Sequence, residues 1–133
     1  MGLDCCASIY KRRIFLPENI IKEFNDSKHA ISRNGEFQGK AYNTFIEIIA
    51  NDSLYCHGSC ELTYESLDKF IKDNHEKLLK DDEEKDQIDL RDYFDDYPEE
   101  PDYKYMCSLH ELYGLCEFFN ICSKHKLCLH SSS

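Results

Sequence analysis

The sequence lacks any long apolar run, because no stretch approaches the roughly 18 apolar residues that a membrane-spanning helix requires. The chain is therefore expected to be soluble or at most anchored to a membrane. It also lacks the basic start and the apolar run of about 7 to 15 residues that mark a secretory signal peptide. Its eight cysteines are accordingly expected to be reduced thiols in a cytoplasmic protein, and not a disulfide framework.

Glycine and proline are scarce, with five and three among 133 residues, so no low-complexity linker divides the chain. A chain of this length with 41% hydrophobic residues is expected to form a single domain over residues 1–133 around one modest core. A dense basic stripe is also absent. Because nucleic acid phosphates require such a stripe, its absence argues against direct binding to DNA or RNA.

What the chain does have is an uneven distribution of charge. The segment Asp81–Lys104 holds twelve of the 26 acidic residues and three of the 16 basic ones, which gives it nine of the ten net negative charges. The remainder is nearly neutral, and residues 1–40 carry seven bases and five acids. We therefore expect residues 81–104 to be an acidic insertion or loop, while an anionic ligand would still find a basic neighbourhood elsewhere.

Regular spacing of apolar residues predicts the main elements. Helical spacing occurs over residues 17–24, 40–50, 63–80 and 108–125, and Ser108 and Glu111 have the spacing of a capping box at the start of the last helix. Residues 3–14 and 127–130 read as strands, and the second is expected to pair with the first. The predicted fold class is α+β, with about four helices packed on a small sheet in which the N-terminal and C-terminal strands pair.

A polar loop before the second predicted helix is a candidate anion site. It contains Arg33, Gly39 and Lys40 and leads to Tyr42. Free backbone N–H groups and the helix dipole favour phosphate at a helix start, and the Tyr42 ring would stack on a base. The alternative is an ordinary solvated loop in which Gly39 caps the helix. The pattern favours a small non-enzymatic module that binds a phosphate-bearing, nucleotide-like molecule.

The acidic segment supplies a second hypothesis, because aromatic residues are interleaved with its acids. Tyr93, Phe94 and Tyr97 lie within it, and Tyr103 and Tyr105 follow at its end. Such a composition is typical of an interaction segment that orders when it binds. In this alternative the chain is an interaction or inhibitor module that docks a basic host protein through residues 81–105.

A third hypothesis is a small zinc-binding protein. Two clusters contain soft and imidazole ligands at close spacing, and their candidate ligands are Cys56, His57, Cys60, Cys122, His125 and Cys128. The spacing does not match the repeated Cys-x-x-Cys pattern of zinc ribbons. Two alternatives stay open: in the first, Cys116 and Cys122 serve as small buried hydrophobes of the last helix, and in the second, Cys56 and Cys60 form a disulfide. No other cofactor is expected.

Catalytic and lipid-anchor patterns are weaker. His57 beside Cys56 and Cys60, or His110 near Cys107, would form a nucleophile pair only if the fold brought the side chains together. The sequence therefore favours binding over catalysis. At the N-terminus, Gly2 and the Cys5-Cys6 pair, together with the bases at 11–13, would supply the two signals that stable lipid anchoring requires.

Three segments behind the Met-Gly-Leu-Asp start carry a resemblance to other proteins. They are Glu36 to Tyr42, Ser53 to Tyr55, and Phe118 to Cys122. Together they resemble a loose group of short uncharacterised bacterial and phage proteins. The resemblance covers about a quarter of the chain, and none of its motifs is a catalytic one. It implies a small antagonist that binds a host protein or sequesters a nucleotide signal.

Overall fold

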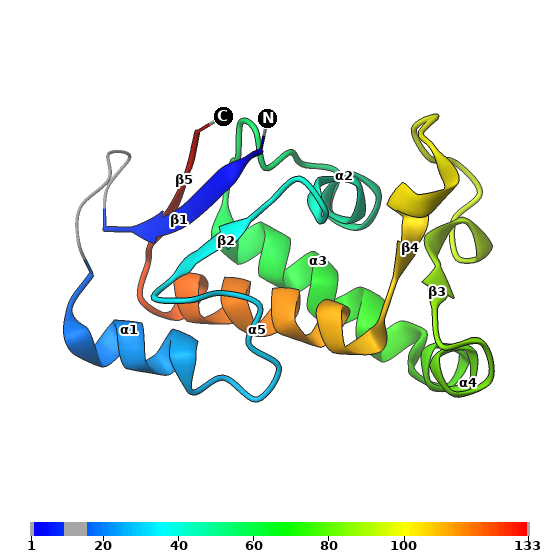
Figure 1. The fold of residues 1–133 in the computed structure, drawn as a ribbon, viewed down its shortest axis with the longest axis horizontal. Helices are drawn as coiled ribbons and strands as arrows, with labels where there is room; N and C mark the ends of the chain where they lie inside the picture. The colour runs from blue at the N-terminus through cyan, green and yellow to red at the C-terminus, as the bar shows by residue number, and fades with distance from the viewer. Residues whose placement is uncertain (1, 10–15, 133) are drawn as a thin grey trace.

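The structure is a computed structural model that describes residues 2–9 and 16–132. It confirms the α+β class. Over the described ranges it contains five α-helices, a three-stranded sheet and a two-stranded sheet (Figure 1). The α-helices are α1 (Glu18–Asn25), α2 (Asn43–Ala50), α3 (Cys60–Asp73), α4 (His75–Lys85) and α5 (Leu109–Lys124).

The three-stranded sheet joins the two ends of the described chain. Its strands are β1 (Asp4–Ser8), β2 (Glu36–Gln38) and β5 (Cys128–Ser132), with β1 in the centre and both neighbours antiparallel to it. The predicted pairing of the N-terminal and C-terminal strands is therefore confirmed. Strand β1 ends at Ser8, and residues 10–14 of the predicted first strand lie outside the described residues.

Strand β2 lies in the segment that the sequence indicated as a polar loop. It contributes one buried side chain, Phe37, and a tight turn precedes it. Asn34 and Gly35 both adopt positive φ angles of 56° and 81° there, a conformation that asparagine and glycine tolerate best. The Asn34-Gly35 signal thus predicts the turn, whereas a three-residue strand is too short to show an alternating pattern.

Helices α3 and α5 run through the centre of the molecule (Figure 1). The three-stranded sheet lies at one end of this pair, and α4 with β3 and β4 lies at the other (Figure 1). The buried stripe of α5 is fully shielded from solvent at Leu112, Leu115, Phe119 and Cys122. Burial of such side chains is worth about 1.5–3 kcal/mol each, so α5 contributes substantially to the stability of the core.

The sequence predicted one helix from Thr63 to Lys80, and this was wrong at both ends and in the middle. Helix α3 begins earlier, because the Ser59 hydroxyl accepts a hydrogen bond from the Leu62 amide and caps it. It stops at Asn74, whose side-chain amide donates to the Phe70 carbonyl (2.9 Å). Asparagine competes for backbone partners in this way and interrupts helices. Helix α4 then continues to Lys85, well into the acidic segment.

The rest of the acidic segment is folded against the core. It contains β3 (Ile88–Asp89) and two short 3₁₀ helices, Leu90–Asp92 and Asp102–Tyr105, and is followed by β4 (Met106–Cys107), which pairs with β3. Ile88 and Leu90 are fully buried members of the hydrophobic core. Residues 81–104 are therefore attached to the core through Ile88 and Leu90, although most of their side chains are exposed or half-buried.

Helix α5 begins with the predicted capping box. The Ser108 hydroxyl accepts from the Glu111 amide, and the Glu111 carboxylate accepts from the Ser108 amide. A further partner comes from the acidic segment, because the Asp82 carboxylate accepts from the Leu109 amide (3.1 Å). A negative charge at a helix N-terminus is stabilising. Among the described residues, no helix is both long and apolar enough to cross a membrane.

Candidate functional site

The acidic-aromatic segment (residues 81–105) is held in shape by its own side chains. The buried Tyr105 hydroxyl accepts from the Glu100 amide (2.7 Å) and donates to the Pro98 carbonyl. Arg91 binds Asp89 through two of its nitrogens and reaches Asp102 (2.8 Å) with a third. These contacts fix the turn between residues 96 and 102 without help from any partner.

The predicted partner-binding residues of this segment differ in their availability. The Phe94 ring stacks on Phe70 (5.3 Å between centroids), and the Tyr93 ring meets Phe70 edge-on (5.6 Å). The Tyr93 hydroxyl also donates to the Asp81 carboxylate (2.7 Å). Tyr97 is 41% exposed and Tyr103 is 71% exposed. The outward aromatic surface is therefore provided by Tyr97 and Tyr103, while Tyr93 and Phe94 attach the segment to the core.

Two adjoining shallow hollows lie between the end of α2 and this segment, and we call them together the α2 hollow. Their volumes are about 460 and 490 Å³, and both are lined by Glu47, Asn51 and Pro98. The remaining lining residues are Ile48, Asp52, Ser53, Asp96 and Tyr97. Three of the described lining residues are acidic and none is basic, so the hollow favours a cation.

A second cluster, buried between α3, α5 and the preceding loop, is formed by Asp52, His57, Cys60, Thr63 and Cys122. We call it the thiol cluster. The side chain of His57 is 1% exposed, and its ring stacks on Phe119 (5.2 Å between centroids, 24° between planes). Packing against α5 thus fixes the ring plane.

The protonation of the His57 ring follows from its partners. The Thr63 hydroxyl donates to the Ser59 carbonyl (3.0 Å), so its oxygen acts as the acceptor toward His57 Nε2 (2.9 Å). An Asp52 carboxylate oxygen lies 3.4 Å from the same nitrogen. Two acceptors around Nε2 require the proton there. Nδ1 then carries a lone pair, and this buried atom has no hydrogen-bond partner among the described residues.

The surroundings of the two cysteines in the thiol cluster shift their pKa values in opposite directions. A hydrogen bond from the Cys122 thiol, with the neighbouring His57 ring, lowers the pKa of Cys60 to about 6 despite its burial. Burial, and then the interaction with Cys60, raises the pKa of Cys122 well above its usual value. Cys60 is therefore the thiolate of the pair near neutral pH, and Cys122 is the thiol that donates to it.

The predicted zinc ligands are only partly brought together. His57, Cys60 and Cys122 belong to the thiol cluster, while Cys56 is exposed and His125 contacts the Glu23 carboxylate near α1. All eight cysteines fall in the described ranges and are free thiols, including the Cys56 and Cys60 pair. Over residues 2–9 and 16–132, no group of three or more His, Cys, Asp or Glu residues is placed to hold a metal ion. The zinc hypothesis stays a prediction.

The predicted phosphate-binding residues are not brought together in the α2 hollow or in the hollow on the three-stranded sheet. Arg33 precedes β2, whereas Gly39 and Lys40 follow it. The Gly39 amide already donates to the Leu3 carbonyl (2.7 Å). The Tyr42 ring is half-buried, with its centroid 5.9 Å from that of Phe37.

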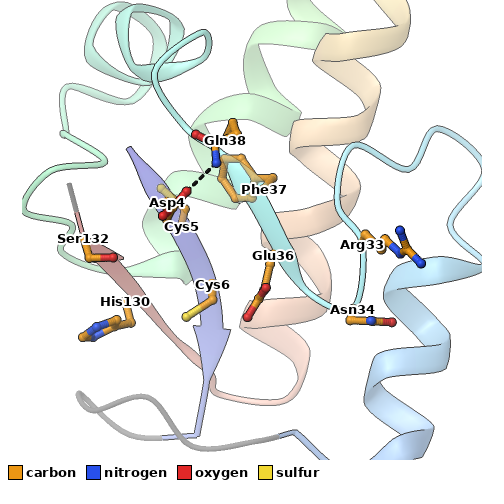
Figure 2. Close-up of a pocket in the computed structure, with 10 residues that line it drawn as sticks. All are labelled: Asp4, Cys5, Cys6, Arg33, Asn34, Glu36, Phe37, Gln38, His130 and Ser132. Atoms are coloured by element: carbon orange, nitrogen blue, oxygen red, sulfur yellow. Dashed lines mark hydrogen bonds between the residues drawn. The ribbon is translucent and has the colours of Figure 1, made fainter. Parts of the chain in front are cut away.

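Of these four residues, only Arg33 lines the hollow on the outer face of the sheet, which has a volume of about 540 Å³. Figure 2 shows the Arg33 side chain directed toward α1 and away from His130 and Cys6. The same hollow carries the carboxylates of Asp4 and Glu36. A phosphate group would therefore meet acids as well as a base there, and the prediction stays untested.

The remaining cysteine candidates are buried, whereas Gly2 and His110 are exposed. Cys5 and Cys6 are buried in β1, and burial raises the pKa of Cys5 to about 12. The bases at 11–13 lie outside the described residues. Cys107 is buried in β4, and burial raises its pKa above the usual range, so it lacks the thiolate character of a nucleophile.

Sequence reasoning missed Asp52 and Thr63, which hold His57, and Glu47, which lines the α2 hollow. Each is an ordinary polar residue with no spacing signal, and its role appears only when the folded chain brings its partners beside it. Comparison of the chain with protein-family models, curated proteins and solved structures finds no match. The function is therefore argued from this geometry, and the resemblance to bacterial and phage proteins stays a prediction.

Proposed function

We propose that this protein is a binding module that docks a basic segment of a partner protein on the α2 hollow. The observation that supports the proposal is the lining of the α2 hollow: Glu47 and Asp96 line the same part of it as the half-exposed Tyr97, Asp52 lines the adjoining part, and no described lining residue is basic. The proposal narrows the interaction hypothesis from the whole of residues 81–105 to one face. The proposed function is compatible with the expected cytoplasmic location.

The chemistry of the α2 hollow suits a lysine or arginine side chain. The carboxylates would accept hydrogen bonds from its ammonium or guanidinium group, and the face of Tyr97 would contribute a cation–π interaction of about 0.5–1 kcal/mol at an exposed site. Single exposed ion pairs contribute little, about 0–1 kcal/mol. Affinity would therefore come from several basic side chains of one segment, with neighbouring acids such as Asp95 and Glu99 accelerating the encounter.

An arginine-rich peptide and a glutamate-rich peptide of equal length test this site by fluorescence anisotropy. We expect the intact protein to bind the arginine-rich peptide and not the other. Changing Glu47 and Asp96 together to glutamine and asparagine should weaken binding about tenfold, since two contacts worth about 0.7 kcal/mol each would be lost. Tyr97→Ala should weaken it by a smaller factor.

A matched control separates the site from net charge. Glu83 and Glu84 are exposed acids of α4, within the acidic segment but outside the α2 hollow. Changing both to glutamine removes the same two charges, and binding should stay within about twofold of the original because long-range interactions are screened. Equal weakening in both double variants would show nonspecific attraction and would refute a site at the hollow.

The phosphate-site hypothesis makes a different prediction, which can be tested in the same protein. A nucleoside triphosphate held jointly by Arg33 and Lys40 should raise the melting temperature, and Arg33→Ala and Lys40→Ala should each remove that increase. Lys28→Ala is a suitable control for charge, because Lys28 lies in the loop after α1. If the nucleotide leaves the melting temperature of the intact protein unchanged, the phosphate-site hypothesis is wrong.

A further inference from the structure

Two histidine rings meet beside the start of α5, and neither of them lines the α2 hollow. They are His110, in the first turn of α5, and His29, in the loop that follows α1. Their ring centroids lie 5.1 Å apart, with 73° between the ring planes. We call them the histidine pair. Since the pair has no role in peptide docking, its geometry calls for a separate explanation.

The Glu117 carboxylate determines where the His29 ring carries its proton. One carboxylate oxygen accepts from the Ser27 hydroxyl (2.7 Å) and from the His29 amide (2.9 Å), and the other lies 2.5 Å from Nδ1 of the His29 ring. Burial raises the pKa of Glu117, but these hydrogen bonds outweigh burial and hold the pKa below its usual value. An ionised carboxylate only accepts, so Nδ1 carries the proton and donates it. In the neutral imidazole, Nε2 then presents its lone pair.

The His29 ring is also held firmly against α5. The Tyr113 ring packs on it, with 5.0 Å between the centroids, and the His29 side chain is only 21% exposed. The backbone is equally close, because a Cβ atom at Gly114 would stand 2.3 Å from the His29 carbonyl oxygen. His110, in contrast, is exposed. One imidazole is therefore fixed before a ligand arrives, which favours binding, and the other is accessible from solvent.

The spacing of the two rings matches that of two imidazoles that share one metal ion. A zinc ion lies about 2.0–2.1 Å from a histidine nitrogen and hence about 3.2 Å from the ring centre, so tetrahedral coordination separates two ring centres by about 5.2 Å. The observed separation is 5.1 Å. A histidine that donates its other ring N–H to a carboxylate is also the usual form of a metal ligand, because the carboxylate orients the ring and raises its basicity.

We propose that His29 and His110 bind a zinc ion, with Glu117 as the positioning residue for His29. The two imidazoles occupy two of the four tetrahedral positions, and water molecules complete the set. This site is smaller than the groups of three or more ligands, which the described residues do not form. It also lies outside the cysteine-containing clusters in which the sequence predicted zinc. The bound ion joins the loop after α1 to the start of α5.

Titration of the intact protein with zinc chloride, followed by NMR spectra of the histidine rings, tests this site. The signals of His29 and His110 should shift together and saturate at one ion per chain. His110→Gln removes one of the two ligands, so it should weaken this binding by about tenfold or more. Glu117→Gln keeps both ligands but loses the orienting charge, and the affinity should fall about tenfold.

His125→Gln is the matched control. The His125 ring also contacts a carboxylate, that of Glu23, but His125 lies at the opposite end of α5 from His110. Because distant sites act independently, this replacement should leave the zinc affinity of the histidine pair within about twofold of the original.

Three results would overturn the proposal. They are ring signals of His29 and His110 that do not shift at about millimolar zinc, a His29 shift that persists unchanged in His110→Gln, and zinc that shifts only His57. The last result would assign the ion to the thiol cluster. Since His110 is exposed, His110→Gln should fold normally. Circular dichroism of that variant verifies the fold, so the second result is decisive.

Discussion

Replacing Phe119 by alanine is expected to lower the free energy of unfolding by about 3–5 kcal/mol. Phe119 is fully buried on the central helix α5, and its ring contacts that of Phe118 (5.4 Å between centroids) as well as the His57 ring. Alanine would leave a cavity between α3, α5 and the loop that carries His57.

Urea denaturation followed by circular dichroism measures this loss. Tyr103→Ala is the matched control, because it removes an aromatic ring that is mostly exposed; it should change stability by no more than about 0.5 kcal/mol. A loss below about 1 kcal/mol for Phe119→Ala would contradict the packing described for α5.

Gly114→Ala is expected to destabilise the protein by about 2–3 kcal/mol, even though alanine favours helices over glycine by about 1 kcal/mol. Gly114 lies in the middle of α5, where the chain at residues 29–31 passes very close. A Cβ atom there would stand 2.3 Å from the His29 carbonyl oxygen and 2.4 Å from a methyl carbon of Ile31. Because the carbonyl is backbone, the clash can be relieved only by moving the whole loop away from α5.

Thermal unfolding of Gly114→Ala and Gly58→Ala provides the comparison. The nearest atom to a Cβ at Gly58 would be an Asp52 carboxylate oxygen at 3.4 Å, an ordinary contact. The two variants add the same methyl group, so only its surroundings differ. The Gly58→Ala control should melt within a few degrees of the original protein, and Gly114→Ala should melt about 8–12 °C below the original protein. A Gly114→Ala protein as stable as the control would show that residues 29–31 are not packed on α5.

The elements that the sequence predicted well are those whose signal is local and repeated. Helix α5 was predicted at the correct start because Ser108 and Glu111 satisfy each other within one turn. The pairing of β1 with β5 was predicted because residues 127–130 alternate like a strand, and such a short strand is ordered only when it pairs with another. The interruption at Asn74 was not, because one side-chain hydrogen bond decides between one long helix and two, and helical spacing of apolar residues continues on both sides.

Short strands and polar clusters could not be predicted from the sequence, because they depend on partners elsewhere in the chain. Strands β3 and β4 have two residues each, and each is a strand only because it pairs with the other. Composition indicated that residues 81–104 would be solvated or would order on binding, yet two buried residues, Ile88 and Leu90, attach this segment to the core. Likewise, the spacing of Arg33 and Lys40 favours one anion site only if the intervening residues form a loop, whereas they contain β2.

The hydroxyl of Tyr105 bridges Pro98 and Glu100 from inside the protein, so this part of the acidic-aromatic segment is ordered in the free protein. A segment that is ordered before its partner arrives loses little conformational entropy when the complex forms. Docking on the α2 hollow should therefore resemble the meeting of two rigid surfaces. Calorimetry would show a small heat capacity change, in contrast to the large one that accompanies coupled folding and binding.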